Sequence, residues 1–168
     1  RVHDVAIDAA GEVWIVNTRF SCLATIDPSA SFTPRWRPPF VTAIADGDRC
    51  HLNGLAMRDG APLVATAMAA TDEPGAWRER AADGGVLIDV PSGEIVASGL
   101  CMPHSPRWHA GRVWVLESGR GALGVLDPAS GAVDTVAVLP GFTRGLDFIG
   151  DHAVVGLSQV RETLFADA

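Results

Sequence analysis

Two stretches of the sequence decide the fold, because they repeat one pattern far apart in the chain. Residues 3–18 read HDVAIDAAGEVWIVNT, and residues 104–118 read HSPRWHAGRVWVLES. Each stretch begins with a histidine, turns at a glycine and continues into a second apolar run that contains Trp14 or Trp114. Short apolar runs separated by a glycine turn are typical of a β-hairpin. The chain therefore contains at least two copies of one strand–turn–strand unit.

Weaker copies of this unit lie at residues 51–66 (HLNGLAMRDGAPLVAT) and 143–158 (TRGLDFIGDHAVVGLS). The first three copies continue into a third apolar run that ends at a turn rich in Asp, Pro and Gly, the residues that favour tight turns. These third runs cover residues 23–27, 86–89 and 123–127, and a fourth run follows at 95–98 and 133–139. A repeat of roughly 40 to 50 residues in a strand-rich chain predicts a β-propeller, with four strands in each blade.

We predict an all-β fold over residues 1–168, with about three complete four-stranded blades and a partial fourth in a single domain. Three or four blades do not close a ring, and Arg1 stands immediately before the first predicted strand, so we expect an excerpt of a six- or seven-bladed ring. Two inserted loops are predicted, at about 32–49 and 69–83. The prolines of the first favour an extended connection over strand pairing, and the second contains a short helical candidate at 77–82.

The composition indicates a soluble globular protein, with 48% hydrophobic and 20% charged residues. The net charge of -7 repels phosphate groups, which argues against nucleic acid and anionic membranes as partners. No apolar run approaches the roughly 20 residues that span a bilayer. Three cysteines, Cys22, Cys50 and Cys101, without a CxxC pair favour a reducing compartment, so we expect a cytoplasmic protein.

Three histidines occupy the same repeat position, at the start of three successive blades: His3, His51 and His104. The first strand of each propeller blade lines the central axis, so side chains at one repeat position converge there. Imidazole is a common ligand of transition metals, and three imidazoles leave coordination positions open. We therefore expect a site for one divalent transition metal, for a small polar ligand, or for both. The alternative is that the histidines bond to channel waters and backbone groups.

Further polar residues near the same strand starts are candidates for ligand binding: Asp4, Asn53, Ser105, Arg107 and Arg144. The two arginines could together hold a carboxylate or phosphate, and Asp4 or Asn53 could orient an imidazole ring. For Arg107, the alternative is a salt bridge between blades.

Other groups with chemical potential have a structural interpretation. A hydroxyl recurs where the second strand of each unit ends, at Thr18, Thr66, Ser118 and Ser158. No glycine-flanked nucleophile elbow surrounds any of them, so we expect hydrogen bonding at strand ends. Glu117 and Glu162 could act as general bases, but the pattern favours solvated side chains.

Several longer motifs resemble an uncharacterised bacterial family of conserved hypothetical proteins that share a domain of unknown function. They are WRPPF (36–40), CHLNGLA (50–56), MPHSPR (102–107), PGFTRGL (140–146) and VGLSQVRE (155–162). This resemblance spans nearly the whole chain and implies a longer protein, but it carries no activity. More broadly, an apolar strand followed by Asp-x-x-Gly and an aromatic-containing strand is similar to propellers of the NHL and virginiamycin B lyase type.

A last motif is similar to that of the gluconolactonase and regucalcin lactonases. Asn53-Gly54-Leu55-Ala56 resembles the segment that supplies an asparagine metal ligand there. Met57 to Asp59 replace the usual serine and proline, and no matching acidic motif is present.

Three functional hypotheses follow. The first is an enzyme or enzyme-like protein with an axial histidine site for a metal or a small polar molecule. The second is a non-catalytic scaffold whose two inserted loops bind a protein or peptide. The third is a metal-dependent lactonase that uses Asn53. Whether the protein is an enzyme stays open, because propellers support both catalysis and binding.

Overall fold

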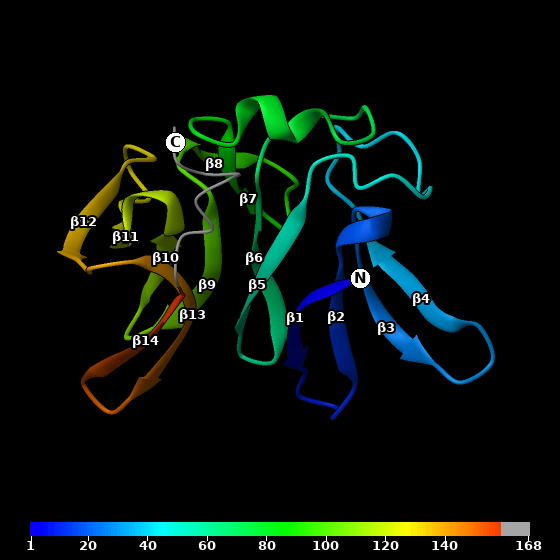
Figure 1. Ribbon diagram of the computed structural model, residues 1–168. Helices are drawn as coiled ribbons and strands as arrows, with labels where there is room; N and C mark the ends of the chain where they lie inside the picture. Colours follow the sequence, from blue (N-terminus) through cyan, green and yellow to red (C-terminus); the bar gives the residue numbers. More distant parts are fainter. Residues whose placement is uncertain (159–168) are drawn as a thin grey trace.

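The protein is described by a computed structural model over residues 1–158. In this range the chain forms three four-stranded antiparallel sheets and one two-stranded sheet, placed side by side in an arc (Figure 1). The first blade comprises β1 (Val2–Ile7), β2 (Val13–Asn17), β3 (Cys22–Asp27) and β4 (Ser31–Trp36). The second comprises β5 (Leu52–Arg58), β6 (Ala61–Ala67), β7 (Gly85–Asp89) and β8 (Ile95–Leu100). The third comprises β9 (Pro103–His109), β10 (Arg112–Glu117), β11 (Ala122–Leu126) and β12 (Val133–Val138), and the partial fourth comprises β13 (Phe142–Ile149) and β14 (His152–Ser158).

The strands of each blade follow one another in chain order, each paired antiparallel with the next. The first strands of successive blades pack against each other, β1 on β5, β5 on β9 and β9 on β13 (Figure 1). Side chains at the head of each first strand are thereby gathered on the inner side of the arc. The predicted all-β propeller, with three complete blades and a partial fourth, is confirmed.

The turn chemistry of the third strands is also confirmed. Asp27, Asp89 and Asp127 each end or follow the third strand, and each carboxylate accepts a backbone N–H from the turn, at 2.8, 2.9 and 3.0 Å. Such bonds satisfy backbone donors where the chain reverses. The fourth strand of each complete blade begins after this turn.

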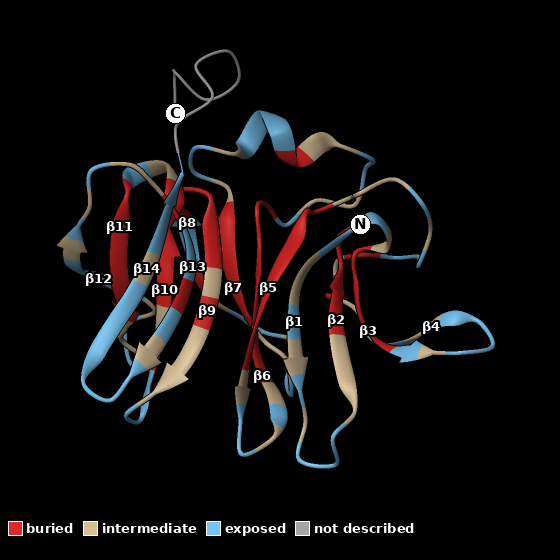
Figure 2. Cartoon of the chain, turned by 60° about the horizontal axis from the view of Figure 1, so that its bottom comes forward, coloured by how far each residue is buried: buried red, intermediate tan, exposed pale blue. Residues whose placement is uncertain are grey.

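The hydrophobic core lies between the blades. Figure 2 shows buried residues where neighbouring sheets face each other and exposed residues along β14. Trp14 packs against the cluster shared by the first two blades, and Trp114 against the cluster shared by the third blade and β13. This is the interblade packing that their repetition in the sequence predicts.

The inner strands approach so closely that one position requires glycine. A Cβ atom on Gly54 of β5 would lie 2.3 Å from Cδ of Pro106 on β9 and 2.5 Å from Oγ1 of Thr66. A larger residue would therefore force the second and third blades apart.

The first inserted loop starts later than predicted. Ser31–Trp36 pairs with β3 as the outer strand β4, so the predicted loop 32–49 is wrong for its first five residues. Pro34 lies in this strand because an outer strand has a free edge, where a missing N–H costs little. The second insertion contains the 3₁₀ helix η2 (Ala76–Arg80), in agreement with the helical candidate. Two further 3₁₀ turns, η1 (Thr18–Phe20) and η3 (Ser118–Arg120), follow β2 and β10.

Both ends of the arc carry exposed large apolar side chains. They lie on β1 and on the β13–β14 hairpin, and comprise Val2, Val5, Ile7, Ile149, Val154 and Leu157. Across residues 1–158, none of the helices has the length and apolar character needed to cross a membrane.

Candidate functional site

The three histidines lie at equivalent places at the heads of adjacent inner strands. His3 is the second residue of β1, His51 directly precedes β5, and His104 is the second residue of β9. The rings of His3 and His51 meet edge to face, with their centroids 4.7 Å apart. The ring of His104 faces Phe142 of β13, with centroids 6.1 Å apart. The predicted repeat position therefore exists, and it gathers the histidines on one side of the arc.

His3 is held by a chain of two hydrogen bonds that joins the first and second blades. The hydroxyl of Thr18 donates to the carbonyl of Leu52 at 2.7 Å, and it lies 2.6 Å from Nδ1 of His3. Because this hydroxyl has a single proton, it accepts from His3, so Nδ1 carries the hydrogen. The lone pair of the neutral ring is then on Nε2.

His104 is held by groups of its own blade. Its Nδ1 lies 3.0 Å from the carbonyl of Met102 and 2.9 Å from the hydroxyl of Ser118. A carbonyl only accepts, so Nδ1 is again the protonated nitrogen. The Nε2 atom is buried and has no partner among the described residues. A buried polar atom without a partner is a position where a ligand or water atom fits.

His51 differs in its partners. Its Nδ1 donates to Oδ2 of Asp48 at 2.8 Å, in the loop before β5. Its ring packs against Trp77 of η2, with centroids 4.1 Å apart. The backbone of His51 is left-handed, with φ of 52°, which turns the chain into the strand and costs conformational energy for a residue other than glycine. The insertion thus supplies one face of the site.

The surroundings of His3 and His104 keep both rings neutral at physiological pH. Burial lowers the pKa of His104 to about 3, with a further contribution from the charge of Arg144. Burial also lowers the pKa of His3 to about 4, together with the charges of His51 and Arg144. A neutral imidazole with Nδ1–H presents an acceptor at Nε2.

Two of the predicted ligand-binding residues, Asp4 and Arg107, bind each other. Arg107 of β9 reaches across β5 to Asp4 of β1, with Nη1 and Oδ2 3.0 Å apart. The same carboxylate accepts the backbone N–H of Leu55 at 3.2 Å. The interblade salt bridge that was the alternative for Arg107 is therefore present. Asp4 does not orient a histidine, because its oxygens are taken up by these partners.

The other predicted residues lie at the same strand heads with separate contacts. Asn53 is buried, its carbonyl oxygen accepts the Thr66 hydroxyl at 2.7 Å, and its Nδ2 has no partner within the described range. The hydroxyl of Ser105 accepts the backbone N–H of Gly145 at 3.2 Å and so links β9 to β13. Arg144 of β13 is the remaining cation, and its charge acts on both His3 and His104.

Three of the four hydroxyls at the strand ends, those of Thr18, Thr66 and Ser118, form hydrogen bonds, and two of these three hold histidines, which the sequence did not predict. Thr18 and Ser118 bond Nδ1 of His3 and His104, whereas Thr66 bonds Asn53. Their recurrence was visible in the sequence, although their partners were not. The contacts of Asp48 and Trp77 with His51 could not be predicted, because both residues lie in insertions outside the repeat.

Of the two candidate carboxylates, Glu117 is buried rather than solvated. It accepts the backbone N–H of Cys101 at 2.9 Å and pairs with Arg120 at 2.6 Å. It therefore stabilises the end of β10. Glu162 lies outside the described residues.

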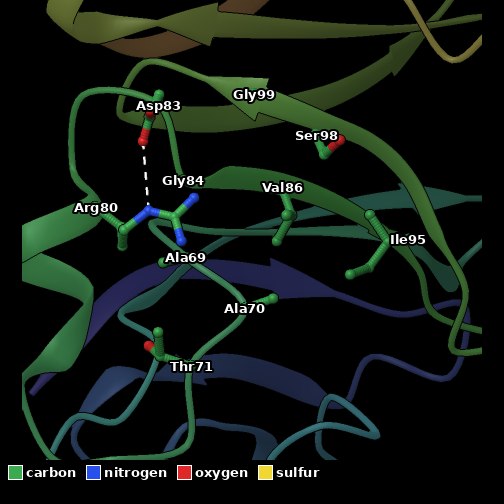
Figure 3. A pocket seen from close by; sticks show the side chains of 10 residues that line it. All are labelled: Ala69, Ala70, Thr71, Arg80, Asp83, Gly84, Val86, Ile95, Ser98 and Gly99. Atoms are coloured by element: carbon green, nitrogen blue, oxygen red, sulfur yellow. Dashed lines mark hydrogen bonds and ion pairs between the residues drawn. The ribbon is translucent and has the colours of Figure 1, made fainter.

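A pocket of about 400 Å³ lies at the second blade, and none of the residues that line it is a histidine (Figure 3). It is lined by the insertion and by β7 and β8, through Ala69, Ala70, Thr71, Arg80, Asp83, Gly84, Val86, Ile95, Ser98 and Gly99. Its two charged residues, Arg80 and Asp83, pair with each other at 3.5 Å. Within residues 1–158, the three histidines included, no group of three or more His, Cys, Asp or Glu side chains is arranged to hold a metal ion.

The fold has counterparts of known structure. A selenomethionine form of virginiamycin B lyase from Staphylococcus aureus matches with a TM-score of 0.55 and 15% identity, over 91% of this chain and 47% of that one. A streptogramin B lyase matches with a TM-score of 0.46 and 11% identity, over 84% and 43% of the two chains. A catalytically inactive S. aureus virginiamycin B lyase with quinupristin gives 0.49 and 12%, over 92% and 62%. The chain spans about half the length of the first of these structures, and at such identities the likeness concerns the fold alone.

The sequence itself matches one family model. No curated protein matches the chain. The model described as a domain of unknown function, DUF4915, matches residues 1–168, in agreement with the resemblance drawn from the motifs. The chain belongs to the DUF4915 family.

Proposed function

We propose that the heads of the inner strands form a binding site for a small polar molecule, which the Nε2 atoms of His3, His51 and His104 contact. One observation carries this proposal. Each of the three rings has its Nδ1 bonded within the protein, to Thr18, Asp48 and to Met102 with Ser118 respectively. No hydrogen bond within residues 1–158 occupies Nε2 in any of them.

The chemistry of such rings is that of acceptors. A neutral imidazole protonated at Nδ1 accepts a hydrogen bond at Nε2 from a hydroxyl or an amine, or removes a proton from it. The lowered pKa values of His3 and His104 keep this lone pair available throughout the physiological range. The site thus suits a molecule with several donor groups.

A divalent transition metal is the second candidate. The 4.7 Å separation of the His3 and His51 rings supports it, and a histidine that binds metal usually donates its other N–H within the protein. Two features favour the small polar molecule. The three rings do not form a group suited to a metal ion within the described residues, and the charge of Arg144 repels a cation.

The remaining hypotheses draw less support. A lactonase would need the amide oxygen of Asn53 as a metal ligand, and that oxygen accepts the Thr66 hydroxyl. A peptide-binding scaffold would use the insertion around η2, but Trp77 is buried against His51 and the core rather than presented to a partner. The insertion therefore supports the histidine site better than it supports a docking loop.

The proposal is tested by NMR on the full-length protein labelled with ¹⁵N in its histidine rings. The probes are glycolamide, glycolate and zinc chloride, each titrated separately at pH 7. We expect glycolamide or glycolate to shift the Nε2 signals of His3, His51 and His104 together. His109, which stacks on Phe148 away from the inner strand heads, and the exposed His152 serve as internal controls.

The outcomes separate the two candidates. Concerted shifts with zinc alone, at one equivalent, would show a metal site and overturn the proposal in favour of the second candidate. The absence of concerted shifts with either organic probe would also overturn it. Shifts with an organic probe that disappear in a His3→Gln, His104→Gln double variant would support it.

A further inference from the structure

We propose that the molecule bound at this site is an anion and that Arg144 binds its charged group. The inference rests on the proposed site for a small polar molecule and adds the class of that molecule.

The negative charges near the strand heads already have partners. Asp4 pairs with Arg107 at 3.0 Å. Asp48 accepts from His51 at 2.8 Å and lies 4.0 Å from Nη1 of Arg1. Neither carboxylate pairs with Arg144 among the described residues.

Among the described residues at the strand heads, Arg144 is the arginine without a partner. It makes no ion pair with any residue in the described range, and no carboxylate acts on its pKa. Although the residue as a whole is exposed, burial of part of its guanidinium lowers that pKa. A guanidinium that is partly removed from water and has no counter-ion is a ready site for an anion, because a charge-assisted bond to carboxylate or phosphate restores what it loses from hydration.

Arg144 also stands where such an anion would meet the histidines. It follows Thr143, which has the same strand-head position on β13 that His104 has on β9, and these two strands pack against each other. The Thr143 hydroxyl is fully buried and has no partner within residues 1–158, as is the case for Nε2 of His104. Two unpaired polar atoms thus lie at equivalent positions of adjacent strands, beside the unpaired cation.

The donors and acceptors define the ligand. Arg144 supplies donors and positive charge, whereas Nε2 of His104 and of His3 supply acceptors. A molecule that complements them carries an anionic oxygen group together with a hydroxyl group. The simplest compound with both groups is glycolate, and glycolamide is its uncharged counterpart of nearly the same size.

The experiment compares these two probes by NMR titration of the full-length protein. We expect glycolate to bind at least about tenfold more tightly than glycolamide, because the charge-assisted bonds are roughly twice as strong as neutral ones. In Arg144→Gln this preference disappears, because the affinity for glycolate falls to about that for glycolamide. Arg144→Lys retains part of the preference. Arg112→Gln, a change of an exposed arginine on β10, serves as the matched control and leaves both affinities unchanged.

Two results would overturn the inference in different ways. Equal binding of glycolate and glycolamide to the unaltered protein would remove the anion preference and leave the proposed small-molecule site standing. A preference for glycolate that survives in Arg144→Gln would assign the anion to another residue. Failure of both probes to bind would instead overturn the proposed function itself.

Discussion

The heads of the second and third blades place a histidine at the same repeat position and hold it in different ways. His104 bonds to a carbonyl and a hydroxyl of its own blade and is 1% exposed. His51 bonds to the carboxylate of Asp48 and is covered by Trp77, both of which come from inserted segments. The repeat thus fixes where the ring lies, and the surroundings decide its chemistry.

This difference assigns different tasks to the two rings. Carbonyl and hydroxyl partners do not balance a positive charge, so His104 serves as a neutral acceptor. A carboxylate partner balances the charge that an imidazole gains when it takes up a proton. In the proposed site, His104 is therefore suited to accept a hydrogen bond from a bound molecule and so to orient it, whereas the ring of His51 lies between Asp48 and Trp77.

The largest expected change in stability comes from removing Trp77, which covers the His51 ring at the start of the second blade. Trp77 is 8% exposed and packs against Met68, Cys101 and Met102 as well as His51. Trp77→Ala should lower the free energy of unfolding by about 3 kcal/mol, since it leaves a cavity. Urea denaturation measures this change. Trp77→Phe keeps most of the packing and should recover most of the loss, whereas equal losses in both variants would show that the cavity is not the cause.

The next effect is the pH dependence of stability that comes from the neutral His104 ring at the start of the third blade. The pKa of His104 is lowered to about 3 from its ordinary 6.5. Between pH 6.5 and 3, this imidazole is therefore protonated in the unfolded chain but neutral in the folded protein. This stabilising contribution is complete above pH 6.5 and is lost as the pH falls towards 3, with a slope of up to about 1.4 kcal/mol per pH unit. We therefore expect the protein to lose roughly 2–3 kcal/mol from this ring between pH 6.5 and 4.5.

Urea denaturation at several pH values checks this slope against two variants. His104→Gln removes the ionisable ring and should reduce the slope, and the slope that remains includes the contribution of His3, whose pKa is lowered to about 4. His152→Gln, at an exposed position, should leave it as it is in the unaltered protein. A pH dependence that is the same in His104→Gln as in the unaltered protein would contradict the assignment of a buried neutral ring.

A smaller effect is expected from the ion pair that joins the first and third blades. Arg107 and Asp4 are 29% and 14% exposed, so their pair is only partly removed from water. Arg107→Gln leaves the carboxylate without its cation and should cost about 1–2 kcal/mol of unfolding free energy. In the double variant with Asp4→Asn much of the loss should return, and purely additive losses would show that the two side chains do not interact.

The sequence predicts the frame of the site better than its chemistry. The repeat places His3, His51 and His104 at the strand heads because a propeller brings equivalent positions together. It also predicts the loops approximately, although the outer strand Ser31–Trp36 was missed because prolines usually argue against pairing. An outer strand tolerates Pro34, and this cannot be inferred before the strand order is known.

The rest of the site depends on contacts between segments that the repeat does not relate. Asp48 and Trp77 lie in insertions, so no other blade has an equivalent that would reveal them. Whether Arg107 binds Asp4 or a ligand depends on the path of its side chain across β5. Of the two interpretations offered from the sequence, only the interblade salt bridge predicted the contact with Asp4. Glu117 was expected to be solvated, and its burial follows from the turn at Cys101, which offers a backbone N–H.

The smallest expected effects distinguish the His3 ring of the first blade from the His104 ring of the third blade. Nδ1 of His3 depends on the Thr18 hydroxyl alone, whereas Nδ1 of His104 has the Met102 carbonyl in addition to Ser118. Thr18→Val should therefore cost about 1 kcal/mol, since it also removes the bond to the Leu52 carbonyl, and Ser118→Ala should cost less.

Ring ¹⁵N spectra give a sharper measure than stability. In Ser118→Ala the hydrogen of His104 should stay on Nδ1, because a carbonyl still accepts it. In Thr18→Val the ring of His3 should populate both tautomers, because its Nδ1 has lost its acceptor. Identical tautomer populations in the two variants would mean that the Met102 carbonyl does not keep the hydrogen of His104 on Nδ1.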